Sequence, residues 1–361
     1  MFTRQRLSFL VTRWTRGTRR TRALVATLLV VVLVAAVSLS NVGGAGSSRA
    51  AARPSIKAGA PYHNPVFARD FPDPSVLRVG ADYYAYATTT GWEQPGRLFP
   101  ILRSRDLVHW AYVADAFSGA PAWGGGDWWA PDVIASKGVY YMYYVGKGID
   151  AGTHCIGVAT ASKPTGPFIH RAVIGCGDSH GRGYIDPAPL IDTDGKAYVY
   201  ISVDDPRHNI SVIPLKRDLL HAAGPRKRLF GVSQAWEHGA NFTTVEGPFA
   251  VKHGKTYDLF YSGNDWQHDY AEGYATSSSP LGPFTKYRGN PVIHDALGVT
   301  GPGGGSVVRG PRGGWWLVYH AWTGGPGYDA GGVRNLRIDP ITWTGDKIGV
   351  RGPTAANEPS P

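Results

Sequence analysis

Four acidic residues share a place in this sequence, because each lies six to nine residues before a glycine that opens a repeated turn. They are Asp73, Asp132, Asp186 and Glu246. If the segments that carry them are equivalent in the fold, the four carboxyl groups converge. Carboxyl groups that share a poorly solvated cleft raise one another's pKa, which separates a protonated acid from ionised bases. Such a pair performs general acid–base catalysis, and carboxyl groups about 6.5–9.5 Å apart hydrolyse a glycosidic bond with inversion.

Each of these acids also has a structural interpretation. An aspartate before proline is often a turn former, which would explain Asp73 and Asp186 without any catalysis. Glu246 alone would be explained by an ion pair in a channel. The shared position of all four before a repeated turn favours a functional site over four separate structural roles.

Tryptophans in the segments between strands are the second group that suggests sugar binding, since aromatic rings stack on the apolar faces of sugars. Trp128 and Trp129 adjoin Asp132, and we expect these two near the site. Core packing is the expectation for the other three tryptophans of such segments, which are Trp92, Trp123 and Trp266.

Five aromatic, alternating segments follow glycine turns and predict the architecture that positions the acids. The turn glycines are Gly80, Gly138, Gly195, Gly254 and Gly314. They are spaced by 58, 57, 59 and 60 residues, a period typical of four-stranded propeller blades. We therefore predict an all-β fold, a five-bladed β-propeller over residues 63–350. The acids would begin four of its inner strands, at one end of a central channel.

The composition agrees with many short strands joined by turns. The 361 residues include 48 Gly and 27 Pro, and charged residues make up only 18%. Richness in glycine and aromatic residues excludes a coiled coil or a helical bundle, and a hydrophobic content of 43% excludes disorder.

The formal net charge of +10 is concentrated at the N-terminus. Seven arginines lie in the first 22 residues, and the charge without them is +3, so no nucleic-acid partner is expected. An uncharged apolar run from Ala23 to Leu39 follows. This pattern predicts a signal peptide or signal anchor over residues 1–45, then a linker over 46–62 and, at the other end, a polar tail over 351–361. We expect a monomer that is secreted or anchored in a membrane facing outside.

Two cysteines, Cys155 and Cys176, are present. An exported protein meets an oxidising environment, so we expect a disulfide between them, with two free buried thiols as the alternative. A zinc–thiolate cluster is excluded because no further cysteine exists to complete it.

Six segments jointly resemble the family 43 glycoside hydrolases, which are five-bladed propellers that act on arabinose- and xylose-based plant polysaccharides. The segments are FPDPSVLRVGADYYAYAT, WWAPDV, YIDPAPLIDTDGKAYVY, VEGPFAVKHGKTYDLFYSG, WWLVYHAW and VRNLRIDPITW. The resemblance covers residues 64–343, which is essentially the whole body of the chain.

The resemblance implies a role for each candidate residue. Asp73 would be the general base that activates water, Glu246 the general acid, and Asp186 the residue that orients this acid and keeps its pKa raised. Four residues would bind or approach the sugar: Trp129, Asp132, His320 and Arg334. Where many members have a histidine that holds an ion, this chain has Gly304 in the segment GPGGGS, so we expect no metal and no other cofactor.

The expected function is that of an exported inverting glycosidase acting on arabinan or arabinoxylan, with α-L-arabinofuranosidase ahead of β-xylosidase and endo-arabinanase. A non-catalytic sugar-binding propeller is an alternative that uses the same channel. A retaining fructan-cleaving propeller is disfavoured, because those enzymes have an RDP segment and a Glu-Cys pair, whereas Glu246 here precedes Gly247.

Overall fold

The computed structural model of this chain describes residues 60–361 apart from 92–95, 179–182 and 346. The predicted leader, nearly all of the predicted linker and Trp92 therefore lie outside the described residues. Among the residues that are described, no helix is long and apolar enough to cross a membrane.

The described residues form 21 β-strands and two short 3-10 helices, so the all-β prediction is confirmed. The strands fall into five successive units. The first unit contains β2 (Ser75–Val79), β3 (Asp82–Tyr86), β4 (Pro100–Ser104) and β5 (Ala111–Asp115). The second contains β6 (Trp129–Ser136), β7 (Val139–Lys147), β8 (His154–Ala161) and β9 (Ile169–Cys176). The third contains β10 (Gly183–Ile191), β11 (Ala197–Asp204), β12 (Asn209–Leu215) and β13 (Lys227–Gly231).

The last two units complete the body. The fourth contains β14 (Val245–His253), β15 (Thr256–Gly263), β16 (Ala271–Ser277) and β17 (Thr285–Lys286). The fifth contains β18 (Thr300–Arg309), β19 (Trp315–Thr323), β20 (Val333–Thr344) and β21 (Lys347–Val350), together with β1 (Phe67–Asp70). The 3-10 helices are η1 (Ala235–Glu237) and η2 (Tyr328–Ala330). Neighbouring strands within each unit pair antiparallel, and one parallel residue pair links the second unit to the third.

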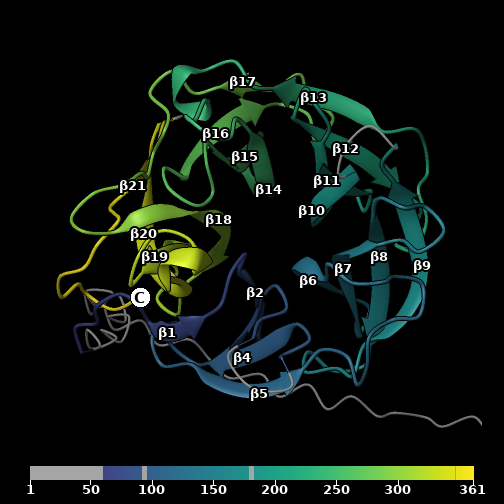
Figure 1. Cartoon of the computed structure of the whole chain (residues 1–361), viewed down its shortest axis with the longest axis horizontal. Helices are drawn as coiled ribbons and strands as arrows, with labels where there is room; N and C mark the ends of the chain where they lie inside the picture. Colours follow the sequence, from purple (N-terminus) through teal and green to yellow (C-terminus); the bar gives the residue numbers. More distant parts are fainter. Residues whose placement is uncertain (1–59, 92–95, 179–182, 346) are drawn as a thin grey trace, which may run out of the picture. The chain divides into compact units, whose positions relative to one another are not determined.

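The five units lie around a common centre, with β2, β6, β10, β14 and β18 innermost (Figure 1). Each innermost strand contacts the innermost strand of the next unit, and β18 contacts β2. Strand β1 pairs with β20, so residues from both ends of the body build the fifth unit. The starts of the innermost strands are thereby brought together.

Glycine turns join the innermost strand of each unit to the second strand. Gly80, Gly138, Gly195 and Gly254 all have the positive φ that favours glycine, between 61° and 80°, as the repeat predicts. In the fifth unit Gly313, with φ 86°, takes this position instead of the predicted Gly314.

Aromatic second strands supply the core between neighbouring units. Tyr86, Tyr144, Tyr200, Tyr261 and Tyr319 are fully buried. A buried phenol needs a hydrogen-bond partner, and two of these reach across the unit boundary to find one. Tyr86 donates to the carbonyl of Pro164 and Tyr200 to that of Pro280, both at 2.8 Å.

Two further expectations concern the ends and the cysteines. The disulfide between Cys155 and Cys176 is present, joining paired residues of β8 and β9. The segment after Val350, expected as a polar tail, instead packs on the body. Glu358 exchanges backbone hydrogen bonds with Tyr62 at 2.7 and 2.9 Å, and the Thr354 hydroxyl donates to Asp339 at 2.6 Å. The folded body therefore extends beyond the predicted boundary at residue 350.

Candidate active site

A pocket of about 310 Å³ opens where the five innermost strands begin. Its wall includes residues of all five strands, so every unit contributes to it. Aromatic residues of the wall are Trp129, Phe249, Trp266, Tyr270 and Tyr328, and its charged or acidic residues are Asp73, Asp132, Asp186, Glu246 and Arg334.

A backbone kink at the start of each innermost strand determines which side chains face this pocket. Five residues, one from each unit, share this place and a left-handed φ between 40° and 60°: Asp73, Ala130, Asp186, Gly247 and Gly304. In β18 a second residue, Gly301, also has a φ of 58°. Proline follows the first four of these, and the strand pairing shifts register around the last four. Aspartate and glycine suit this conformation better than most residues, which explains their occurrence at four of the five positions.

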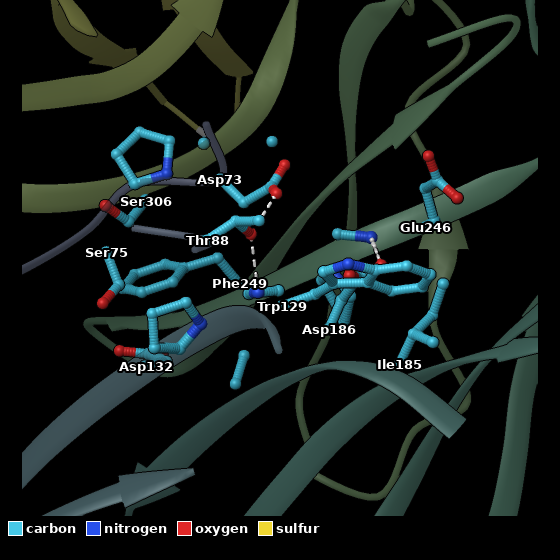
Figure 2. A pocket seen from close by; sticks show the side chains of 18 of the residues that line it. Asp73, Ser75, Thr88, Trp129, Asp132, Ile185, Asp186, Glu246, Phe249 and Ser306 are labelled. Carbon is cyan, nitrogen blue, oxygen red and sulfur yellow. Dashed lines mark hydrogen bonds between the residues drawn. The ribbon is translucent and has the colours of Figure 1, made fainter. Parts of the chain in front are cut away.

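The kinks correct the prediction that all four acids occupy one position of the repeat. Asp73 and Asp186 do share it, but Glu246 lies one residue before the kink and Asp132 two residues after it. The number of residues between the kink and the turn glycine differs from unit to unit. The distance of an acid from its turn glycine therefore does not indicate its position relative to the kink. Figure 2 shows the result, with Asp132 apart from Asp73, Asp186 and Glu246.

Polar side chains on the second strands hold the kinks in place. In four cases a side chain of the second strand, or in the first unit Thr88 just after it, accepts the backbone N–H of the kink residue in the next unit. The pairs are Thr88 with Ala130 (2.8 Å), Ser202 with Gly247 (3.0 Å), Ser262 with Gly304 (2.9 Å) and His320 with Asp73 (3.0 Å). At the fifth junction the corresponding residue is the apolar Val145.

Asp73 is the acid that the surroundings keep ionised. Burial acts to raise its pKa, but the Arg334 guanidinium, 3.3 Å from Oδ1, and the Thr88 hydroxyl, which donates to Oδ2 at 2.6 Å, bring the pKa below its ordinary value (Figure 2). An ionised carboxylate can accept a proton from water, as a general base must.

Asp186 and Glu246 form a coupled pair of the opposite kind. Burial is the main cause that raises the pKa of both carboxyl groups. Repulsion from Asp73 raises the pKa of Asp186 further, and repulsion from Asp186 does the same for Glu246. Asp186 accepts hydrogen bonds from the Ser202 hydroxyl (2.9 Å) and the Gly247 N–H (3.0 Å) at one oxygen. These two donors favour the ionised form of Asp186, so the proton that the pair retains resides on Glu246.

His320 was expected to bind the sugar, but its side chain has no exposed surface. Its Nδ1 accepts the Asp73 N–H, and burial lowers its pKa to about 3, so the ring is neutral with its proton on Nε2. In this structure His320 supports the backbone of Asp73 from behind the pocket wall.

Arg334 lies in the pocket wall, as the resemblance implied. Its guanidinium bonds Asp73 through Nη1 and the Tyr328 hydroxyl through Nε and Nη2, at 3.1 and 3.0 Å. The rings of Trp266, Trp322 and Tyr328 surround it at 5.3 to 5.7 Å. This cage fixes the cation beside the base and leaves little freedom to its long side chain.

The tryptophan predictions are only partly right. Trp129 lines the pocket, with its ring stacked on His154 at 4.6 Å between centroids. Trp128 is buried in the core against Trp123 and Tyr144, so its expected place at the site is wrong. Trp266, expected in the core, lines the pocket instead.

Asp132 also lines the pocket but differs from the catalytic candidates. Burial raises its pKa to about 7, against the opposing effect of the Val133 N–H, which donates to Oδ1 at 2.7 Å, and of the Ser75 side chain. At mildly acidic pH Asp132 is therefore protonated and able to donate to a hydroxyl.

Several site residues escaped the sequence analysis. Thr88, Ser202 and Ser262 hold the kinks, and Tyr270 contacts Glu246. The hydroxyl residues have a readable signal, since each lies seven or eight residues after its turn glycine, in or just after a mainly apolar second strand. Tyr270 has none, because it lies in the connection between β15 and β16.

Within the described ranges, no three His, Cys, Asp or Glu side chains are grouped so as to ligate a metal ion. The side chains present there therefore do not fit a metal ion that they would ligate directly.

Glu272 is a buried acid outside the pocket whose ionisation should affect stability. Burial raises its pKa to about 8, while its Oε2 accepts the Gly305 N–H at 3.2 Å. A carboxyl with a raised folded pKa contributes stability that is complete below its unfolded pKa, near 4.5, and is lost as the pH rises toward 8.

At pH 8 the free energy of unfolding of Glu272→Gln should therefore exceed that of wild type by about 2–4 kcal/mol, and this difference should vanish near pH 4.5. Urea unfolding at both pH values measures it. All other titrating groups are common to the two proteins. A difference in unfolding free energy that is equal at pH 4.5 and pH 8 would therefore contradict a buried, protonated Glu272.

Comparison with known proteins decides the family. A model of the glycosyl hydrolases family 43 matches residues 62–348. The chain belongs to this family. This family 43 member is similar to a thermostable family-43 glycoside hydrolase of known crystal structure, with 33% sequence identity and a TM-score of 0.74. The match covers 83% of this chain and 99% of that one.

Two curated relatives of this family 43 member show the range of its similarities. It is 28% identical to the non-reducing end alpha-L-arabinofuranosidase BoGH43B of Bacteroides ovatus, covering 81% of this chain and 54% of the relative. It is 24% identical to the extracellular exo-alpha-(1->5)-L-arabinofuranosidase ArbA of Cellvibrio japonicus, covering 77% and 85%. The chain thus spans about half the length of the Bacteroides relative.

Proposed function

We propose that this family 43 member is an inverting glycoside hydrolase with the active site of a five-bladed β-propeller, and that it acts as an α-L-arabinofuranosidase. The cyclic contacts among the five innermost strands support the propeller. The observation that carries the chemistry is one pocket in which Asp73 has a lowered pKa and Glu246 a raised one.

In the proposed reaction, the sugar lies between Asp73 and Glu246. Asp73 takes a proton from a water molecule as the water oxygen attacks the anomeric carbon. Glu246 gives its proton to the oxygen of the leaving group as the glycosidic bond breaks. Attack on the face opposite the leaving group inverts the anomeric configuration. Asp186 stays ionised beside Glu246 and holds the proton on the acid until it is needed.

The preference for arabinose rests on relatives whose names include arabinofuranosidase. Other relatives are a putative beta-xylosidase of Xylanibacter ruminicola and an extracellular endo-alpha-(1->5)-L-arabinanase of Thermotoga petrophila. Arabinan or arabinoxylan is the proposed substrate. Export, with the leader removed or kept as an anchor, is proposed from the arginines and the apolar run of the first 39 residues.

The deciding experiment compares release from 4-nitrophenyl α-L-arabinofuranoside, 4-nitrophenyl β-D-xyloside and arabinan. We expect the arabinofuranoside to be cleaved fastest and arabinan to lose single sugars from its ends. Faster release from the xyloside, or internal shortening of arabinan, would replace the arabinofuranosidase assignment by xylosidase or endo-arabinanase. Proton NMR of the first-formed product tests inversion, and a product with the substrate's anomeric configuration would refute it.

A further inference from the structure

Tyr270 connects the proposed acid to the backbone of the fifth innermost strand. Its side chain is buried, yet its hydroxyl reaches the pocket and lies 2.8 Å from Oε1 of Glu246. Its ring stacks on His320 at 5.9 Å between centroids and 15° between planes. Since His320 in turn accepts the N–H of Asp73, one packed block spans from the acid to the base.

The hydrogen bonds that end at Glu246 have a fixed direction. The Gly304 N–H can only donate, and it donates to Ser262 Oγ at 2.9 Å. The Ser262 hydroxyl is therefore free to direct its own hydrogen to the Tyr270 oxygen, an interaction that acts to lower the pKa of Tyr270. Tyr270 then donates to Glu246 Oε1. Every oxygen in this series accepts from one side and donates to the other.

We propose that Tyr270, oriented by Ser262, is a positioning residue that reserves Oε1 of Glu246 as a hydrogen-bond acceptor and so places the catalytic proton on Oε2. A carboxylic acid carries its proton on one oxygen, and the oxygen that accepts the Tyr270 hydrogen is not that one. The acid then presents a single defined O–H to the leaving group. This role rests on the proposed function of Glu246 as general acid.

Other groups also face Glu246. Asp186 on β10, Asp204 at the end of β11 and Asp73 before β2 all repel its ionised form. The Thr244 hydroxyl donates to Oε2 over 3.5 Å and also lies 3.3 Å from Nδ1 of His208. The Tyr270 hydroxyl donates to Oε1 over only 2.8 Å, so Oε1 is the more strongly engaged acceptor of the two carboxyl oxygens.

Tyr270→Phe removes the hydroxyl and keeps the ring that stacks on His320. For arabinobiose, whose leaving group needs protonation, kcat should fall about 10- to 100-fold, the effect of losing one hydrogen bond to a group that becomes charged. For a 2,4-dinitrophenyl arabinofuranoside, whose leaving group departs as an anion, the loss should be only a few-fold. Ser262→Ala should give a smaller loss with the same dependence on the leaving group.

The matched control is Tyr274→Phe, which also deletes a buried hydroxyl of the fourth unit, but one that accepts the Ile348 N–H outside the pocket. It should leave the ratio of the two rates unchanged. Equal losses of Tyr270→Phe on both substrates would overturn the proposal, because a merely structural defect does not depend on the leaving group.

A second readout needs no turnover. Carbon-13 NMR of glutamate-labelled protein, with Glu246 assigned by comparison with Glu246→Gln, follows the ionisation of this side chain directly. Loss of the donating hydroxyl should move the titration of Glu246 to higher pH in Tyr270→Phe, and an unchanged or lowered midpoint would refute the role of Tyr270. If wild type hydrolyses neither substrate, the proposed function fails, and this titration still decides whether Tyr270 donates to Glu246.

Discussion

Glu246→Gln is expected to lower kcat on arabinobiose by about 10²- to 10⁴-fold, the usual contribution of a general acid. The amide keeps the size of the side chain and can still accept the Tyr270 hydrogen, but it has no acidic proton to give. On a 2,4-dinitrophenyl glycoside the loss should be far smaller, since that leaving group does not require protonation. Steady-state rates on the two substrates measure the contrast.

The matched control is Glu272→Gln, the same change at another buried acid of the fourth unit that does not line the pocket. It should retain turnover at pH 6. Calorimetric titration with arabinose oligosaccharides provides the comparison with a non-catalytic sugar-binding protein. Sugar binding without any wild-type turnover, and with no change in Glu246→Gln, would favour that alternative over an enzyme.

The pH dependence of kcat should follow the two opposite pKa shifts. Asp73 has a pKa below its ordinary value of 3.8, so the base remains ionised through the mildly acidic range. Glu246 has a pKa above its ordinary value of 4.5, so the acid remains protonated well beyond the pH at which an exposed glutamate ionises. Activity should therefore decline on the alkaline side as Glu246 ionises, and Glu246→Gln should abolish that decline for the activated substrate.

The sequence carries the architecture because the glycine turns and aromatic second strands recur at nearly constant spacing. Backbone conformation at Gly80, Gly138, Gly195 and Gly254 needs a residue without a side chain, and this requirement is visible in one dimension. The fate of residues 351–361 is not visible in this way. Their packing depends on partners distant in sequence, such as Tyr62 at the other end of the body, and polar composition alone does not indicate it.

The site was predictable as a set of acids but not as a geometry. Whether a carboxyl group faces the pocket depends on its offset from the kink, and a single residue changes its direction. The repeat therefore grouped Asp132 with the other three acids, whereas its offset from the kink in β6 differs from theirs. The adjacent Trp128 and Trp129 face opposite ways for the same reason, one into the core and one into the pocket.

Asp73→Asn should lower kcat by about 10²- to 10⁴-fold on activated and ordinary substrates alike, because water must be deprotonated whatever the leaving group is. Asparagine is the informative replacement, since it tolerates the left-handed φ of 52° and keeps an acceptor for the Thr88 hydroxyl, so the fold should survive. Alanine would combine the loss of the base with backbone strain. Asp82→Asn, at a partly exposed aspartate of β3 that is paired with Arg103, serves as the control.

Asp73→Asn and Glu246→Gln thus differ in how their activity depends on the leaving group, and this difference assigns the roles of base and acid. If Asp73 is the base and Glu246 the acid, an activated leaving group restores the kcat of Glu246→Gln but not that of Asp73→Asn. The neighbouring charges support this order, because Arg334 stabilises a negative Asp73 while Asp186 disfavours a negative Glu246. Rescue of Asp73→Asn by the activated substrate, with Glu246→Gln left inactive, would exchange the two roles and require water to attack from the side of the fourth unit.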